Sequence, residues 1–267
     1  MLEKMIIGRY VPGTSFVHRL DPRSKLLFIF FFIFTVFLAN DLLSYSLLLA
    51  FTFFAVWLTQ IPFRFLFNGL KIVFYLILFT FLMHVAFTKG GEVLFSIGRF
   101  HIYEEGLKQG FFISIRFFTL IFMTTLLTLT TSPISVTDGV ERLLNPLNAL
   151  KFPVHELALM MSIALRFIPT LMDETDKIVK AQVARGSDLN TGTLKERFQA
   201  VVPLLIPLFI NSFKRATDLA VAMEVRGYRG GEGRTRYRQL AWQGRDTLVL
   251  LVLFAFSGVL LYLRMKG

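Results

Sequence analysis

The chain has 267 residues, of which 54% are hydrophobic and 31 are Phe, and its formal net charge is +11 at pH 7. This is more apolar surface than one soluble domain can cover, so the composition indicates a membrane protein with several spans. The absence of Cys excludes a disulfide framework, thiolate catalysis and Cys-ligated zinc. Most of the positive charge flanks apolar runs, which indicates membrane topology rather than nucleic-acid binding.

Five apolar runs are candidates for membrane helices, and a long segment separates the fourth from the fifth. A helix needs about 20 apolar residues to cross a bilayer core of roughly 30 Å. The runs cover residues 26–39, 42–61, 72–87, 111–131 and 248–263. We therefore predict an all-α membrane protein with about five transmembrane helices. Its regions are residues 1–131 with four spans, residues 132–245 with two long cytoplasmic helices, and residues 246–267 with the last span.

The basic residues predict how the chain is oriented. Arg9, Arg19, Arg23 and Lys25 precede the first run, Arg64 and Lys71 follow the second, and Lys and Arg outnumber Asp and Glu in residues 132–245. With five spans these segments share one side, which the positive-inside tendency makes cytoplasmic, and the C-terminal tail lies outside. Fewer basic residues oppose this orientation, namely Lys89, Arg99, Lys108, Arg264 and Lys266. We expect a multi-pass protein of the cell membrane with a cytoplasmic N-terminus.

The segment 132–245 carries helical patterns of its own. A short amphipathic helix is predicted over 136–150, and a long one over 155–185 with a kink at Pro169. After a turn at 187–192, a second long helix follows, and Pro203 and Pro207 should bend it. Two long helices with apolar faces and a tight turn between them should pack on each other. The alternative is that both are additional membrane spans.

Both long helices end in similar motifs, Ala184-Arg185-Gly186 and Val225-Arg226-Gly227. Glycine commonly ends a helix, and a cation is favoured at the negative end of the helix dipole. Ordinary C-terminal capping explains either motif alone. Their repetition, with an alanine four residues before each arginine, favours two docking points for partner proteins.

At these residues the sequence resembles a known family, the transmembrane T component of energy-coupling factor transporters. The resemblance covers essentially the whole chain. Its motifs are Gly8-Arg9-Tyr10, Pro12, Ser15, His18-Arg19-Leu20-Asp21-Pro22-Arg23 with Lys25, Arg166-Phe167-Ile168-Pro169, Ala184-Arg185-Gly186, Arg215, Asp218, Ala222-Met223 and Val225-Arg226-Gly227-Tyr228. The chain departs from the family pattern at Val225, where an alanine is expected.

The resemblance implies a coupling subunit of an ABC-type importer rather than an enzyme. Its two long helices would be coupling helices that dock on two ABC-type ATPase subunits. Each arginine would meet a carboxylate there. ATP would bind those partners, so this chain would hold no cofactor. Its other partners would be the lipid bilayer and a small membrane S component that captures a vitamin or metal ion, in a prokaryotic cell membrane and without nucleic acid.

The charged cluster before the first run is a further candidate. Asp21 is expected to pair with Arg19 or Arg23, and the network would anchor the first span to the coupling helices. The alternative is interfacial charge at a helix that starts at Pro22. Arg116 and Lys71 are expected to extend toward the headgroups.

Metal chemistry and independent transport receive little support from the sequence. The four histidines, His18, His84, His101 and His155, lack partners at metal-ligand spacing, so we expect no metal site. No ladder of acidic residues crosses the apolar runs. A self-sufficient secondary transporter therefore stays the second functional hypothesis, and a membrane-embedded enzyme is the third.

Overall fold

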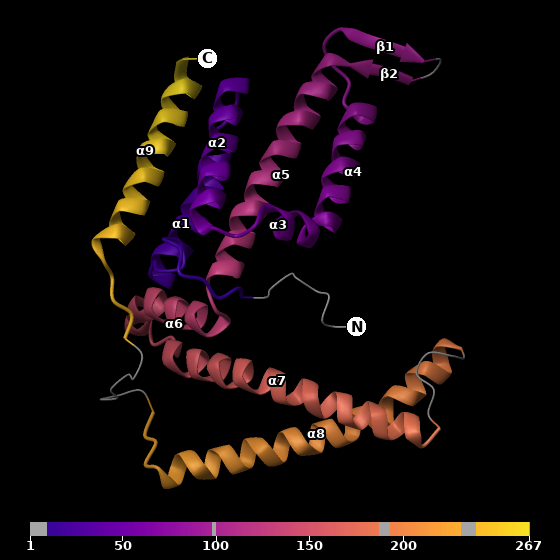
Figure 1. Cartoon of the computed structure of the whole chain (residues 1–267), viewed down its shortest axis with the longest axis vertical. Coiled ribbons are helices and arrows are strands. Elements are labelled where there is room, and N and C mark those ends of the chain that lie inside the picture. The colour runs from indigo at the N-terminus through magenta and orange to yellow at the C-terminus, as the bar shows by residue number, and fades with distance from the viewer. Residues whose placement is uncertain (1–9, 98–99, 187–192, 231–238, 267) are drawn as a thin grey trace. The chain divides into compact units, whose positions relative to one another are not determined.

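The computed structural model describes residues 10–97, 100–186, 193–230 and 239–266 (Figure 1). Contacts divide the chain into two units. The first comprises Met1–Leu143 with Leu240–Gly267, and the second is Leu144–Gln239. The motif residues Gly8 and Arg9 and the predicted turn at 187–192 lie outside the described residues.

Helices dominate the first unit, as the apolar runs predict. They are α1 (Pro22–Val36), α2 (Leu42–Thr59), α3 (Phe63–Gly69), α4 (Lys71–Phe87), α5 (Glu104–Thr130), α6 (Pro133–Leu144) and α9 (Gly244–Lys266). A short antiparallel hairpin, β1 (Val93–Ile97) with β2 (Phe100–Tyr103), joins α4 to α5. The hairpin was not predicted, although β-branched and aromatic residues on both sides of a Gly-containing turn are its usual signal.

Helix α5 is the centre of the first unit, because α1, α2 and α4 all pack against it (Figure 1). Aromatic rings contribute to the interfaces, and the ring centroid of Phe74 on α4 lies 6.2 Å from that of Phe118 and 6.3 Å from that of Phe122 on α5. Helix α9 packs on α1, and its Phe256 stacks on Phe51 of α2 at 4.5 Å. Part of the Phe content therefore packs between these helices, while other Phe side chains, such as Phe30, Phe54 and Phe87, are more than half exposed.

Small residues allow α4 and α5 to approach closely. A Cβ atom added at Gly110 would lie 3.2 Å from the Phe81 ring and 3.3 Å from the His84 Cβ. One added at Gly106 would lie 3.1 Å from the carbonyl oxygens of His84 and Thr88. Small residues at a helix interface are the usual way for membrane helices to gain close backbone packing.

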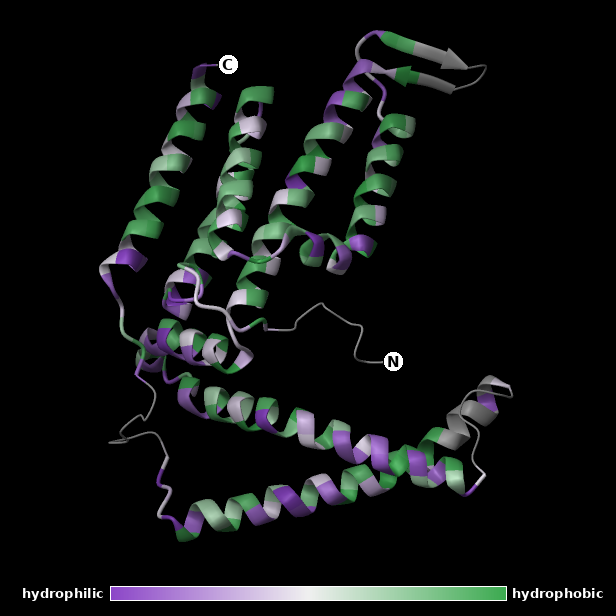
Figure 2. Ribbon diagram, viewed as in Figure 1, coloured by the Kyte–Doolittle hydropathy of each residue, from purple (hydrophilic) through white to green (hydrophobic). Residues whose placement is uncertain are grey.

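The lengths and hydropathies of the helices confirm an all-α membrane protein of about five spans. Among the described residues, four helices are long and apolar enough to cross a membrane, α2, α5, α9 and the second unit's α7. The α3–α4 pair, bent by 65°, makes a fifth if it is one span. Figure 2 shows apolar residues along most of α2, α5 and α9. The predicted first span, α1, has only 15 residues.

Two arginines lie at the C-terminal end of this short α1. Arg116, halfway along α5, donates a hydrogen bond from Nη2 to the Tyr45 hydroxyl at 2.8 Å, and its Cζ lies 5.0 Å from the centroid of the Phe37 ring. Arg264 donates from Nη1 to the Phe37 carbonyl at 3.4 Å. Cations are favoured at this end of a helix dipole. The side chain of Arg116 is therefore bound within the protein. The prediction that it extends toward the headgroups is wrong.

The second unit consists of the 3₁₀ segment η2 (Asn145–Leu150) and two long helices, α7 (Val154–Ala184) and α8 (Leu194–Val225). Both helices continue through their internal prolines, Pro169 in α7 and Pro203 and Pro207 in α8. The predicted helix over 136–150 is wrong in its bounds. It begins at Pro133, where a missing N–H costs nothing, and the 3₁₀ segment replaces it from Asn145.

The close approach of α4 and α5 predicts the effect of adding one methyl group. Gly110→Ala should unfold at a lower temperature than Gly258→Ala. The overpacking should lower its free energy of unfolding by about 1–3 kcal/mol. A Cβ at Gly258 on α9 would meet nothing within 4 Å, so both variants gain the same helix propensity and differ in the clash. Thermal denaturation in detergent measures the difference. Equal midpoints would contradict the packing.

Candidate functional site

Helix α7 ends at Ala184 in the geometry that the sequence motif predicts. The Arg185 amide donates to the carbonyls of Ala181 at 3.2 Å and Gln182 at 3.1 Å, and the Gly186 amide donates to the carbonyl of Val183 at 3.0 Å. Gly186 has φ +89°, in the left-handed region that glycine adopts without steric cost. The helix therefore stops at Arg185 and leaves that residue at its end.

Helix α8 ends in the same way at Val225. The Gly227 amide donates to the Glu224 carbonyl at 2.9 Å, and the Tyr228 amide donates to the Met223 carbonyl at 3.0 Å. Gly227 has φ +73°. These two bonds form a complete Schellman motif, which pairs carbonyls that the helix end leaves free.

The two glycines are needed for their backbone conformation and not for space. A Cβ at either Gly186 or Gly227 would meet nothing within 4 Å. Val225, which stands where the family pattern has alanine, is 82% exposed, and Ala184 is exposed as well. The valine therefore adds bulk on the outside of the α8 end and leaves the cap geometry unchanged.

Both arginines, which we call the tip arginines, are exposed and have no ion-pair or hydrogen-bond partner for their side chains in the part of the chain that the structure describes. Other arginines do have carboxylate partners there, Arg23 with Asp21 and Arg215 with Glu174. Free guanidinium groups at two helix ends suit directional, bidentate binding of carboxylates from another molecule.

The tip arginines lie at opposite ends of the α7–α8 pair. The Glu174–Arg215 ion pair joins the two helices, and a groove of about 290 Å³ beside it is lined by residues from both. Each tip arginine lies the same number of residues beyond its helix's member of this ion pair, Arg185 beyond Glu174 and Arg226 beyond Arg215. Because the two helices run in opposite directions, the tips lie on opposite sides of the ion pair. At 1.5 Å per residue the tips are separated by about 30 Å along the pair.

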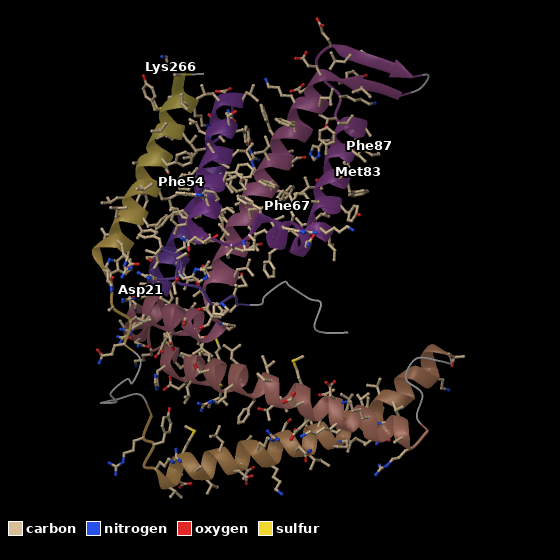
Figure 3. All side chains as sticks on the ribbon, viewed as in Figure 1. Asp21, Phe54, Phe67, Met83, Phe87 and Lys266 are labelled. Carbon is tan, nitrogen blue, oxygen red and sulfur yellow. The ribbon has the colours of Figure 1, made fainter. Side chains whose placement is uncertain are left out.

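A second cluster of charged residues lies at the start of α1, where Figure 3 labels Asp21. Asp21 is the N-cap of this helix, and its Oδ1 accepts a hydrogen bond from the Arg23 amide at 2.8 Å. Arg23 also donates from Nε to Oδ1 at 3.0 Å and from Nη2 to Oδ2 at 2.9 Å. Of the two partners that the sequence left open for Asp21, the structure has Arg23, while Arg19 is exposed.

Asp246, in the first turn of α9, belongs to the same cluster and was missed from the sequence. Its Oδ1 accepts hydrogen bonds from the Asp21 amide and the Ser24 hydroxyl, both at 2.8 Å. Lys25 donates from Nζ to the Thr130 carbonyl at 3.0 Å. A lone carboxylate at the start of the last apolar run was the available signal. We call Asp21, Arg23, Ser24, Lys25 and Asp246 the anchor cluster.

Across the described residues, no group of three His, Asp or Glu side chains is placed to hold an ion. Each ring nitrogen of His18 already has a partner, Nδ1 with the Ser15 hydroxyl at 2.6 Å and Nε2 with the Val11 carbonyl at 3.1 Å. Burial lowers the pKa of His18, which favours the neutral ring at pH 7.

The fold and the two tips define a multi-pass membrane protein whose longest amphipathic helices each present one arginine. Residues 13–237 match the sequence family CbiQ, described as cobalt transport protein. The chain is also similar to transmembrane proteins of energy-coupling factor transporters, each named EcfT. It is 62% identical to the Bacillus subtilis protein over 264 residues, and 56% and 55% identical to those of Macrococcus caseolyticus and Listeria innocua. These alignments cover 99% of this chain and 100% of each relative.

The chain therefore belongs to the family of transmembrane T components of energy-coupling factor transporters, as its motifs suggested. It is a membrane component of a transporter and not an enzyme.

The caps predict what loss of either glycine does. Gly227→Ala forces an L-residue into the left-handed region, at a cost of about 1–2 kcal/mol, so the last turn of α8 should fray. Hydrogen exchange followed by mass spectrometry should then show faster exchange at residues 223–228. Gly258→Ala, in the middle of α9, is the control and should leave that turn unchanged. Equal protection of the α8 end in both variants would contradict the role of the glycine.

Proposed function

We propose that this chain is the coupling subunit of an energy-coupling factor importer. It would transmit the ATP-driven motion of two ABC-type ATPase subunits to a substrate-binding S component, for uptake of a vitamin or a metal ion. The observation that carries the proposal is the pair of exposed tip arginines, Arg185 and Arg226, each set at a helix end by a left-handed glycine. The names of the relatives support it, because each is the transmembrane protein of such a transporter.

The separation of the tips suits two ATPases better than one. Each arginine would bind a carboxylate of its own ATPase, with Ala184-Arg185-Gly186 on one and Val225-Arg226-Gly227 on the other. A packed helix pair can shift as a rigid body while its two ends stay bound. The Glu174–Arg215 ion pair and the contacts between α7 and α8 would hold that body together. The exposed Val225 makes the second contact bulkier than the first.

The apolar faces of the same helices suit an S component. Met160, Met161 and Met172 on α7, and Phe209 and Phe213 on α8, are all at least 44% exposed. Methionine adapts to different surfaces, which would allow different S components to bind the same face. The prolines Pro169, Pro203 and Pro207 would shape these faces, since proline removes a hydrogen bond inside a helix.

The remaining assignments follow from the coupling role. Residues 132–245 would be the coupling region, between the membrane regions 1–131 and 246–267, with the N-terminus and both coupling helices in the cytoplasm. The excess of basic residues in these segments supports this orientation. ATP would bind the ATPases, and this chain would hold no cofactor. A self-sufficient secondary transporter is disfavoured, because the relatives are components of a larger transporter.

Charge reversal of the tip arginines tests the proposal. In Arg185→Glu and Arg226→Glu, a carboxylate faces the partner carboxylate, so each variant should lose its ATPase. The loss of one member of a desolvated pair costs about 2–5 kcal/mol, more than tenfold in affinity at the lower end. The measurement is affinity purification of the tagged chain from membranes, with the ATPases quantified by mass spectrometry.

The matched control is Arg229→Glu, an exposed arginine three residues beyond the second tip and outside the cap. It changes the net charge equally and should keep both ATPases. A double variant, Arg185→Glu with Arg226→Glu, that still purifies with both ATPases in wild-type amounts would refute the docking role of the tips.

A further inference from the structure

The anchor cluster buries charge where α1 begins. Asp21 and Lys25 are each 6% exposed, Ser24 is fully buried and Asp246 is 1% exposed. Two carboxylates, Asp21 and Asp246, lie with two cations, Arg23 and Lys25, so the charges balance within the cluster. A buried ion pair adds little stability compared with apolar packing, because desolvation offsets its attraction. Stability alone therefore does not account for this cluster, and geometry is the better explanation.

Asp246 accepts three hydrogen bonds, two of which connect the first and last helices of the first unit. One oxygen, Oδ1, accepts from the Asp21 amide and the Ser24 hydroxyl, and the other, Oδ2, accepts from the Gln243 amide at 2.8 Å. The first two donors belong to the start of α1, and the third belongs to the residue before α9. One carboxylate thus holds two helix starts together, and every one of its partners is a donor.

The chain leaves the first unit at the end of α6 and returns to it at Leu240. The first turn of α1 contacts the chain near both of these places. On the outgoing side, α6 approaches α1 closely at Gly139, where an added Cβ would lie 3.2 Å from the Pro22 Cβ and 3.1 Å from the Leu26 side chain. The chain then continues directly into residue 144 and the second unit.

On the returning side, the chain re-enters the first unit at Leu240. Arg23 donates from Nη2 to the Leu240 carbonyl at 3.4 Å, and its Cζ lies 5.6 Å from the centroid of the Trp242 ring. The guanidinium of Arg23 therefore binds Asp21 and the returning segment at once. Both connections of the α7–α8 unit are attached to the same turn of α1.

We propose that Asp246 is a positioning residue for coupling, which holds α1 and α9 as one body where both connections of the α7–α8 unit attach. Displacement of that unit then reaches the two helices together. Without the carboxylate the starts of α1 and α9 can shift relative to one another, and only the contacts farther along the two helices, such as the Thr35–Ser257 hydrogen bond at 2.7 Å, still join them. This inference rests on the proposed function, because it presupposes that α7 and α8 move with the ATPases.

The test is Asp246→Asn in the complete complex with its ATPases and S component. Asparagine keeps one acceptor oxygen, but its NH₂ group replaces the oxygen that accepts from the Gln243 amide. The chain has no Cys, so spin labels can be attached at introduced cysteines, Phe30→Cys on α1 and Leu251→Cys on α9. Both positions are more than half exposed. Electron paramagnetic resonance then measures the distance between the labels with and without Mg-ATP.

With Asp246 present, we expect the α1–α9 distance distribution to stay narrow in both nucleotide states. With Asp246→Asn, we expect the complex to assemble and hydrolyse ATP, while Mg-ATP broadens the distribution. Asp41→Asn is the matched control, because Asp41 precedes α2 as an exposed residue whose side chain makes no capping bond. It should behave as the wild type.

Two outcomes overturn the inference. One is a narrow distribution in Asp246→Asn with Mg-ATP, and the other is broadening to the same extent without nucleotide, which a merely structural role produces. If Asp246→Asn does not assemble, the same distance measurement on Arg23→Lys decides the question. Lysine keeps the positive charge but lacks the planar fork with which arginine joins Asp21 to Leu240, so Mg-ATP should broaden the distribution in this variant as well. Failure of the proposed function is recognised separately, because the wild-type chain would then bind no ATPase.

Discussion

The buried carboxylate of Asp246 joins the starts of the first and last helices of the first unit. It accepts a hydrogen bond from the amide of Asp21, the N-cap of α1, and so joins the starts of two helices through residues that are 225 positions apart in the sequence. Burial of this charge is tolerated because three donors surround it, Arg23 and Lys25 lie nearby, and Asp21 is itself paired. The positions of α6 and of the returning segment follow, since both pack on the same turn.

Helix ends are a second physical constraint, and they explain why arginine and glycine occur together at both tips. The last carbonyls of a helix lack partners within it, and a left-handed residue lets the following amides bind them. Glycine takes that conformation at the lowest cost, so the chain turns sharply and the preceding arginine stays at the end. Arg185 and Arg226 are thereby presented by the backbone and do not depend on packing around their side chains.

Apolar contacts between helices supply the rest of the first unit. Helix α5 receives α1, α2 and α4, and glycines at its α4 face bring two backbones close enough for rings and carbonyls to touch. Helix α5 also contributes a charged group, Arg116, whose guanidinium lies at the end of the short α1 and donates a hydrogen bond to the Tyr45 hydroxyl. Charged groups in this unit occur mainly at helix ends, where free amides and carbonyls offer them partners.

Much of this protein followed from the sequence alone. Apolar runs predicted the helices α1, α2, α4, α5 and α9, and glycine placed the ends of α7 and α8 within a residue, because hydrophobic periodicity and capping act over a few neighbouring residues. The tertiary structure alone decided the bend between α3 and α4, the hairpin, the shortness of α1, and the choice of Arg23 over Arg19 as the partner of Asp21. It also revealed Asp246, whose partners are distant in sequence. Such pairings depend on which helix ends meet in space, and no local pattern records that.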